Sequence, residues 1–145
     1  MFYCSIEDIE KQISTLSLIQ LSNDETSQDG IDRTVCEEAL IYSSTLIDGY
    51  LRGKYPVPLN TSFPLLRVLA IDLSIYRLFS RRIQIEIPEV IIENYKNALK
   101  THEQLKKGII TLETEENTKI PSSGEYRTNK TPQDRLFNKR KMNEY

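Results

Sequence analysis

Apolar residues recur every three or four positions through much of the first 112 residues, which is the spacing of amphipathic α-helices. The first such stretch follows Ser5, and Asp8 three positions later completes an approximate capping box. Ser14 and Thr15 interrupt the pattern, so residues 16–21 are expected to form a second short helical turn. The N-terminal segment therefore opens the fold with a short helix.

Three longer helices are predicted after a polar loop at residues 22–31. Asp32 can cap the first, and Gly53 ends it. The second opens near Pro64 and is apolar on most of its surface, so we expect it to be the most buried element. The third runs from Pro88 to Gly108, a glycine in the usual place of a C-terminal cap. Strand patterns are nearly absent, with brief candidates at residues 83–87 and 109–112.

Residues 113–145 differ in composition from the rest of the chain. They are rich in Thr, Asn, Ser, Pro, Lys and Glu, and they have no apolar repeat before Leu136. Such a composition is typical of a flexible segment. We therefore predict an all-α protein, with a small bundle of about four helices in residues 1–112 and an extended, flexible C-terminal tail at residues 113–145.

The end of that tail has a pattern of its own. Asn138 can cap a last helical turn, which places Phe137 and Met142 in the positions of a hydrophobic staple. A helix this short is unstable alone in water, so its apolar residues need a groove on another surface. We predict a segment that docks on a partner, formed by Arg135, Leu136, Phe137, Met142 and Tyr145. The alternative is a disordered end with aromatic residues by chance.

Charge is unevenly distributed along the chain, although the net charge is only -2. Residues 1–31 contain six acidic residues and one basic residue, whereas residues 126–145 contain six basic residues and two acidic ones. Ends of opposite charge favour contacts between neighbouring copies or with a partner. They are also compatible with two solvated polar ends.

The sequence predicts neither a membrane protein nor an exported one. Its longest apolar stretch, residues 64–73, is broken by Arg67 and Asp72 and is far shorter than the roughly 20 residues that span a bilayer. Acidic residues follow the start of the chain closely, unlike a signal peptide. Cys4 and Cys36 are expected to be reduced and structural, in a protein made in a reducing cytoplasm.

No motif for catalysis, a metal or a cofactor is predicted. His102 is the one histidine, and we expect it at a partly exposed surface or core-edge position rather than in a catalytic one. The five glycines do not cluster into a phosphate-binding loop. We therefore predict that the protein is not an enzyme and binds no cofactor.

Four charged residues on the helices are candidates for polar pairing within or between subunits. Asp48 and Asp72 each interrupt an apolar helix. Arg52 follows Asp48 at helical spacing, and Arg77 follows Asp72 by five residues, which is too far for ideal pairing on one face. Because buried charges need partners, we expect these residues at helix or subunit interfaces.

Several short motifs follow one another along the chain in an order that is more informative than any one of them. These are Tyr3 and Asp8 near the start, then Ile47-Asp48-Gly49-Tyr50-Leu51, Lys54-Tyr55-Pro56-Val57-Pro58-Leu59, Ala70-Ile71-Asp72-Leu73-Ser74-Ile75-Tyr76-Arg77-Leu78, Tyr95-Lys96-Asn97-Ala98, Leu105-Lys106-Lys107-Gly108, and Asp134-Arg135-Leu136-Phe137 before a final Tyr145. The ordered set resembles the small helical proteins of the head gene cluster of Mu-like phages. It is also similar in size and layout to head–tail connector adaptors of long-tailed phages.

The resemblance implies a virion protein at the head–tail junction. Adaptors of this type form a ring of about twelve copies beneath the portal, extend the DNA channel, and hold a stopper or tail-completion protein. Genome DNA passes through such a ring without being read in sequence. The expected partners are therefore other copies of the chain, the portal and the stopper, with no membrane.

The alternative interpretation is a small DNA-associated or regulatory helical protein. Arg77, Arg81 and Arg82 cluster at the end of one predicted helix, and Lys139 to Lys141 add a second basic group. The sequence pI of about 5.5 argues against a dedicated nucleic-acid binder.

Overall fold

The structure, a computed structural model, describes residues 1–24, 30–59 and 62–112. The chain divides into two units, Met1–Leu112 and Glu113–Tyr145. The predicted flexible tail and its docking segment lie outside the described residues. The described residues of the first unit form five helices: α1 (Ile6–Gln12), α2 (Thr15–Ser22), α3 (Arg33–Leu51), α4 (Pro64–Ser80) and α5 (Glu89–Lys107). No strand occurs in the described ranges, and the all-α prediction is confirmed.

The N-terminal segment forms two helices rather than one helix and a turn. Ser5 and Asp8 form the predicted capping box at the start of α1. Ile13 then takes an extended conformation that ends α1, and the Ser14 side chain accepts a hydrogen bond from the Ser17 amide at 3.2 Å. Ser14 is thus a second capping residue, directly after the end of α1, and it starts a new helix. The number of helices is therefore five rather than the expected four.

The three long helices begin and end as the sequence predicts. The Asp32 side chain accepts hydrogen bonds from the amides of Thr34 and Val35 at the start of α3. α4 opens with Pro64 in its first turn, and α5 follows Pro88. Gly108 ends α5 with φ 78°, the left-handed conformation that glycine adopts without strain. The strand candidate at residues 83–87 is instead part of the turn between α4 and α5.

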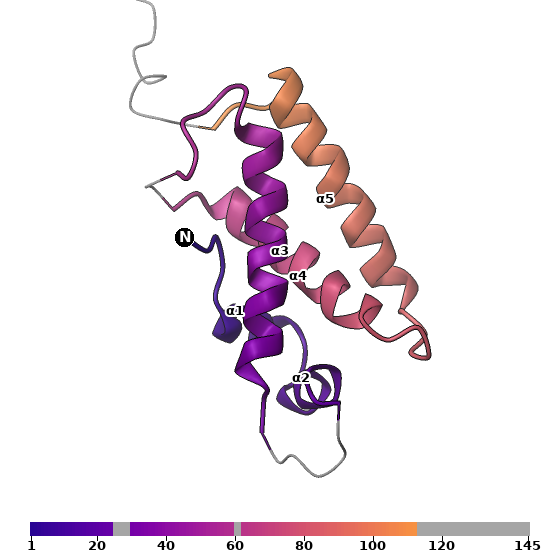
Figure 1. The fold of residues 1–145 in the computed structure, drawn as a ribbon. Coiled ribbons are helices and arrows are strands. Elements are labelled where there is room, and N and C mark those ends of the chain that lie inside the picture. The colour runs from indigo at the N-terminus through magenta and orange to yellow at the C-terminus, as the bar shows by residue number, and fades with distance from the viewer. Residues whose placement is uncertain (25–29, 60–61, 113–145) are drawn as a thin grey trace, which may run out of the picture. The chain divides into compact units, whose positions relative to one another are not determined.

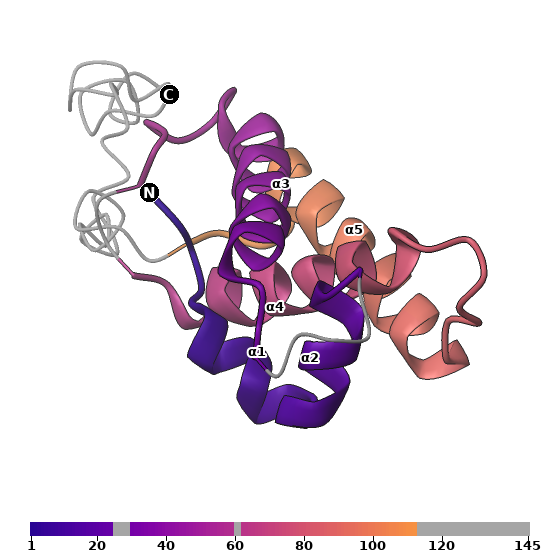
Figure 2. The same ribbon diagram turned by 60° about the horizontal axis from the view of Figure 1, so that its bottom comes forward.

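α4 is the central element of the first unit. It contacts each of the other four helices, while α3 and α5 also contact one another. α3 crosses α4, α5 packs against both of them, and α1 and α2 lie together near the N-terminal end of α3 (Figure 1; Figure 2). α3 and α4 have seven buried residues each, but α4 has 17 residues against 19 in α3, so the larger share of α4 is buried, as predicted.

One apolar core joins all five helices. Its fully buried members include Ile9, Leu18, Ile47, Leu51, Leu66, Leu73, Leu78 and Leu105. Burying one such side chain contributes roughly 1.5–3 kcal/mol relative to leaving it in water. Tyr55, just after α3, is also part of this core. Its hydroxyl oxygen accepts a hydrogen bond from the Leu112 amide at 3.0 Å. The described chain therefore ends beside the C-terminal end of α3.

Candidate interaction surfaces

Asp48 pairs with an N-terminal tyrosine rather than with Arg52. The Tyr3 hydroxyl donates a hydrogen bond to Asp48 Oδ1, and the same oxygen of Tyr3 accepts one from the Leu59 amide at 3.5 Å. Burial and this bond to Asp48 raise the pKa of Tyr3 to about 12. Arg52 is exposed, and among the described residues no ion pair joins it to Asp48. Tyr3 thus ties the N-terminal segment both to Asp48 of α3 and to the loop that follows this helix.

Asp72 and Arg77 lie in different surroundings. Asp72 is half-buried in a hollow of about 240 Å³, beside Gln12 of α1 and Asn94 of α5, and burial raises the pKa of its carboxyl group. The Arg77 guanidinium stacks over the Tyr42 ring, 5.1 Å from its centroid. The structure therefore places the two residues in separate interhelical contacts and does not pair them with each other.

A tyrosine cluster lies where α3, α4 and α5 meet. The rings of Tyr76 and Tyr95 stack with their centroids 3.8 Å apart and their planes 11° apart. A hydrogen bond with Tyr42 and partial burial raise the pKa of Tyr95 to about 12. Arg77 extends the cluster through Tyr42. These rings join the three long helices.

The basic end of α4 is bound to the end of α2. Arg81 Nη1 donates to the carbonyl oxygen of Leu21 at 2.8 Å, and its Nη2 contacts both carboxylate oxygens of Asp24 at 2.9 and 3.0 Å. Arg82 Nη2 donates to the carbonyl of Asn23 and to Asp24. Cations are favourable at the negative C-terminal end of a helix. Two of the three arginines in the predicted basic cluster therefore hold α2 in place.

A second polar tie, between α1 and the start of α4, was not found from the sequence. Arg67 Nε donates to Asp8 Oδ2 at 2.9 Å, and Arg67 Nη2 donates to Asp8 Oδ1. This two-bond geometry is the strong form of an arginine–carboxylate contact. The bonds from Arg67 hold the pKa of the Asp8 carboxyl well below its usual range. Asp8 was recognised only as a capping residue, because its partner is 59 positions away.

His102 is wholly buried, so the expectation of a partly exposed position was wrong. Its Nδ1 lies 2.6 Å from the Ala98 carbonyl oxygen, and the Tyr50 ring lies 5.4 Å from its own ring. Its Nε2 is buried without a hydrogen-bond partner among the described residues. Burial lowers the pKa of His102, which favours the neutral ring.

Both cysteines are buried and free, as predicted. Cys4 Sγ lies 3.9 Å from the Ser74 hydroxyl oxygen. Burial raises the pKa of each thiol to about 11. Because the thiolate is the reactive form, both side chains are held in their unreactive state.

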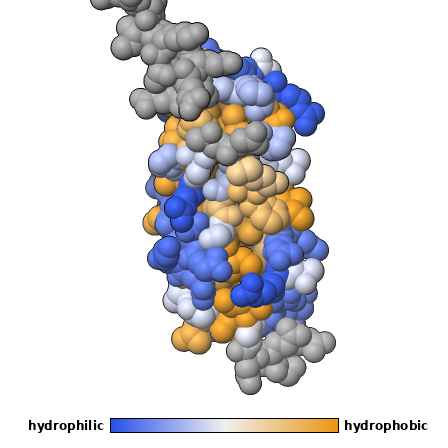
Figure 3. All heavy atoms as spheres, turned by 90° about the vertical axis from the view of Figure 1, so that its left-hand side faces the viewer, coloured by the Kyte–Doolittle hydropathy of each residue, from blue (hydrophilic) through white to orange (hydrophobic). Residues whose placement is uncertain are grey.

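Apolar residues on the surface border three hollows. The first holds Asp72 and is flanked by Val90, which is 66% exposed. The second, about 390 Å³, lies between α3 and α5 and is lined by Tyr42, Leu46 and Tyr50. The third, about 350 Å³, lies between α1, α2 and the start of α3. On the side of the unit that carries α1, apolar surface is flanked by hydrophilic side chains (Figure 3).

Two further properties of the described residues concern metals and membranes. They contain no group of three or more His, Cys, Asp or Glu side chains placed to hold a metal ion. None of the helices in this part of the chain is long and apolar enough to cross a membrane.

The family model described as Bacteriophage Mu, Gp36 matches residues 3–130. The chain belongs to this family. None of the curated proteins matches it. The resemblance to Mu-like phage proteins is thereby confirmed, and the chain is a phage protein with an all-α first unit.

The match to the Gp36 family covers all five helices. It therefore includes Asp48, Arg52, Asp72 and Arg77, whose places in the fold are described above. The predicted docking residues Arg135, Leu136, Phe137, Met142 and Tyr145 follow the end of the match. Their role stays a prediction.

Proposed function

We propose that this Gp36-family protein is a head–tail connector of the virion. In this role about twelve copies form a ring beneath the portal, bind the stopper or tail-completion protein on the other side, and surround the DNA channel. The ring contacts DNA through its lumen without sequence-specific binding. Family membership supports a phage structural role, and the arrangement of the surface supports the ring.

The observation that carries the proposal is the presence of separate apolar surfaces on one small body. The hollow at Asp72 and the hollow between α3 and α5 share no lining residue. Exposed apolar side chains flank both, with Val90 at the first and Ile41 one helical turn from Thr45 of the second. A closed ring of identical subunits needs two different contact surfaces on each copy, because its contacts are heterologous.

The arginines at the end of α4 form contacts within the fold, which supports the connector function over DNA binding. Arg81 and Arg82 are engaged by α2 and Asp24, and Arg77 lies over Tyr42. Protein–DNA affinity comes largely from basic side chains that are available to phosphates. The DNA-binding alternative depends on these arginines. Their contacts within the fold make them less available to phosphates.

Heads assembled without this chain provide the test. We expect them to contain the portal and packaged DNA but to fail to join tails, and addition of the purified full-length chain should restore joining. Electron microscopy of the restored heads should show an added ring of about twelve copies at the portal vertex. Normal tail joining by heads that lack the chain would contradict the proposal.

The predicted docking segment gives a second test of the same function. Deleting residues 125–145 should leave the helical content and melting temperature nearly unchanged and abolish attachment to portal-bearing heads. If the truncated protein attached with wild-type affinity, the helical unit would have to carry that contact instead.

A further inference from the structure

The hollow between α1, α2 and the start of α3 combines an apolar lining with an acidic rim. Three partly buried isoleucines, Ile6, Ile19 and Ile31, provide the apolar part. Glu7 and Glu10 of α1 line the same space. A volume of about 350 Å³ can accept one or two large apolar side chains, so the hollow has the size and chemistry of a site for a short amphipathic peptide.

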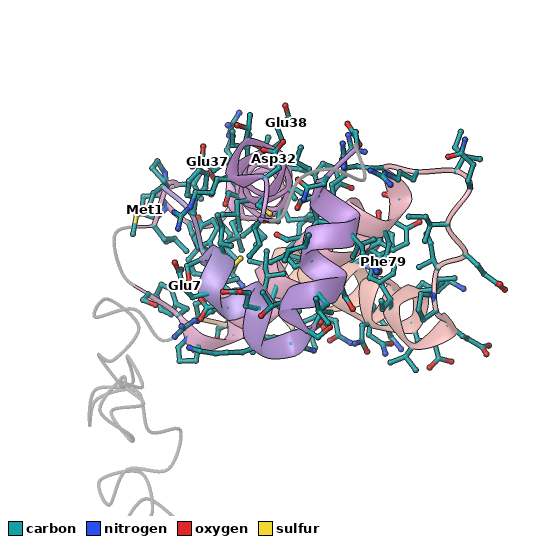
Figure 4. The ribbon with its side chains drawn as sticks, turned by 90° about the horizontal axis from the view of Figure 1, so that it is seen from below. Met1, Glu7, Asp32, Glu37, Glu38 and Phe79 are labelled. Atoms are coloured by element: carbon teal, nitrogen blue, oxygen red, sulfur yellow. The ribbon has the colours of Figure 1, made fainter. Side chains whose placement is uncertain are left out.

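The surroundings of the hollow are negatively charged. Asp32 and Glu37 lie on the adjoining start of α3, on the same side of the unit as Glu7 (Figure 4). Arg33 is the one basic residue in the lining, and it helps to lower the pKa of Glu7, after the hydrogen bonds at the start of α1. Carboxylates therefore outnumber basic groups around the apolar surface, which favours a basic partner.

We propose that this hollow binds the C-terminal segment, residues 126–145, of a second copy of the chain. That segment carries six basic residues against two acidic ones. Its apolar side chains Leu136, Phe137 and Met142 are adjacent in sequence to these charges. The occupant thus matches the site in both of its properties, with apolar groups for the isoleucines and cations for the carboxylates.

The hollow and the start of the C-terminal segment lie at opposite ends of α3, which suits a contact between two copies. The hollow lies at Arg33, where α3 begins, whereas Leu112 is bonded to Tyr55 just beyond the end of α3. The 19 residues of α3 separate these points by about 28 Å. A contact from one end of a copy to the opposite end of the next repeats from copy to copy and is heterologous. The inference rests on the proposed assembly function, for which it supplies a subunit contact.

A charge-swap experiment on the full-length chain tests the contact. One variant carries Glu7→Lys and Glu10→Lys, and the other carries Lys139→Glu and Lys141→Glu. Each variant alone should self-associate at least tenfold more weakly than the wild type in sedimentation equilibrium at low salt. An equimolar mixture should regain association, because the reversed site of one variant then meets the reversed segment of the other, and the unchanged pair also remains complementary.

The matched control reverses two exposed carboxylates elsewhere, Glu86→Lys and Glu93→Lys. It changes the net charge by the same amount as the site variant and should leave association unchanged. Circular dichroism checks that every variant keeps its helices. A wild-type chain that stays monomeric at all concentrations, or a mixture that does not regain association, would overturn the proposal.

Carbodiimide cross-linking then identifies the partner copy. In a mixture of ¹⁵N-labelled and unlabelled chains, bonds between Lys139 or Lys141 and Glu7 or Glu10 should join peptides of different isotopic composition. Links found only within one isotopic form would show that the segment binds its own chain and would contradict the proposal. Neither measurement uses heads or portal, so a failure of this contact is distinguishable from a failure of the connector function.

Discussion

The two N-terminal helices are held by polar ties in addition to the shared apolar core, whereas the three long helices are held mainly by that core. α3, α4 and α5 have 17–19 residues each and share most of the buried leucines and isoleucines. α1 and α2 have 7 and 8 residues, too few to be stable alone, and each is joined to α4 by arginines. Arg67 at the start of α4 holds α1, and Arg81 and Arg82 at its end hold α2.

This difference shows how one helix serves two regions. The middle of α4 contributes Leu69 and Leu73 to the core, while its two ends carry the polar ties. Basic residues at helix ends are usually solvated, yet here they fix the position of other elements. The comparison predicts that changes in the middle of α4 affect the whole unit, and that changes at its ends affect mainly one short helix.

The largest effect is expected from Leu73→Ala, in the middle of α4. Leu73 is fully buried, so the change should lower the free energy of unfolding by about 2–5 kcal/mol, through lost burial and the cavity left behind. Val68→Ala is the control on the same helix, because Val68 is 56% exposed. Urea denaturation measures both. A loss below about 1 kcal/mol for Leu73→Ala would mean that α4 is not the core element.

Arg67→Met should weaken the tie to α1, with a smaller effect that depends on pH. The pKa of Asp8 is lowered in the folded protein, so its contribution to stability is fully present above its unfolded pKa of about 3.9 and is lost as the pH falls toward the lower folded value. The wild type should therefore exceed the variant in stability at pH 6, and the gap should narrow below about pH 4.

Chemical denaturation at several pH values measures that gap. Arg52→Met is the matched control, because Arg52 is exposed and has no ion pair among the described residues. It should leave the stability curve nearly unchanged at every pH. An equal effect of the two substitutions would support the Asp48–Arg52 pairing predicted from the sequence instead.

The sequence predicted the elements of the fold much better than its polar contacts. Helix boundaries at Asp32, Pro64 and Gly108 depend on neighbouring residues, so local patterns were enough to place them. The break at Ser14 was visible as well, although its strength as a second cap was underestimated. Local chemistry therefore fixed where each helix begins and ends.

Partners far apart in sequence could not be assigned in this way. Asp48 was matched with Arg52 by helical spacing, but Tyr3 reaches it across 45 positions. His102 lies between Thr101 and Glu103 in sequence, which suggested partial exposure, yet the packing of α5 turns it fully inward. Burial and long-range pairing depend on how whole helices pack, and a single sequence does not contain that arrangement explicitly.

Gly108→Ala tests how much the left-handed backbone at the end of α5 matters for stability. The left-handed backbone at φ 78° should cost an alanine about 1–2 kcal/mol. A Cβ there would also lie 2.6 Å from Lys54 Nζ, which must move away. Gly53→Ala is the control, since a Cβ at Gly53 meets nothing within 4 Å. Thermal unfolding should separate the two variants. Equal melting temperatures would show that the end of α5 adapts without cost.

The smallest effect on global stability is expected from the double change Arg81→Gln and Arg82→Gln at the other end of α4. Both arginines contact Asp24, which is largely exposed, so water and salt weaken these ion pairs. Their bonds to the carbonyls of Leu21 and Asn23 should matter locally. Amide hydrogen exchange in α2 should therefore accelerate by up to about tenfold, while exchange in α3 stays unchanged.

DNA binding by the same double variant tests whether Arg81 and Arg82 serve the fold or bind phosphates. Because these arginines are engaged within the fold, the variant and the wild type should bind DNA equally weakly at low salt, and both should lose that binding at moderate salt. If the substitutions sharply reduced DNA affinity and left exchange in α2 unaltered, Arg81 and Arg82 would be a phosphate-binding surface. The ties at the two ends of α4 would then differ in kind, with only Arg67 serving the fold.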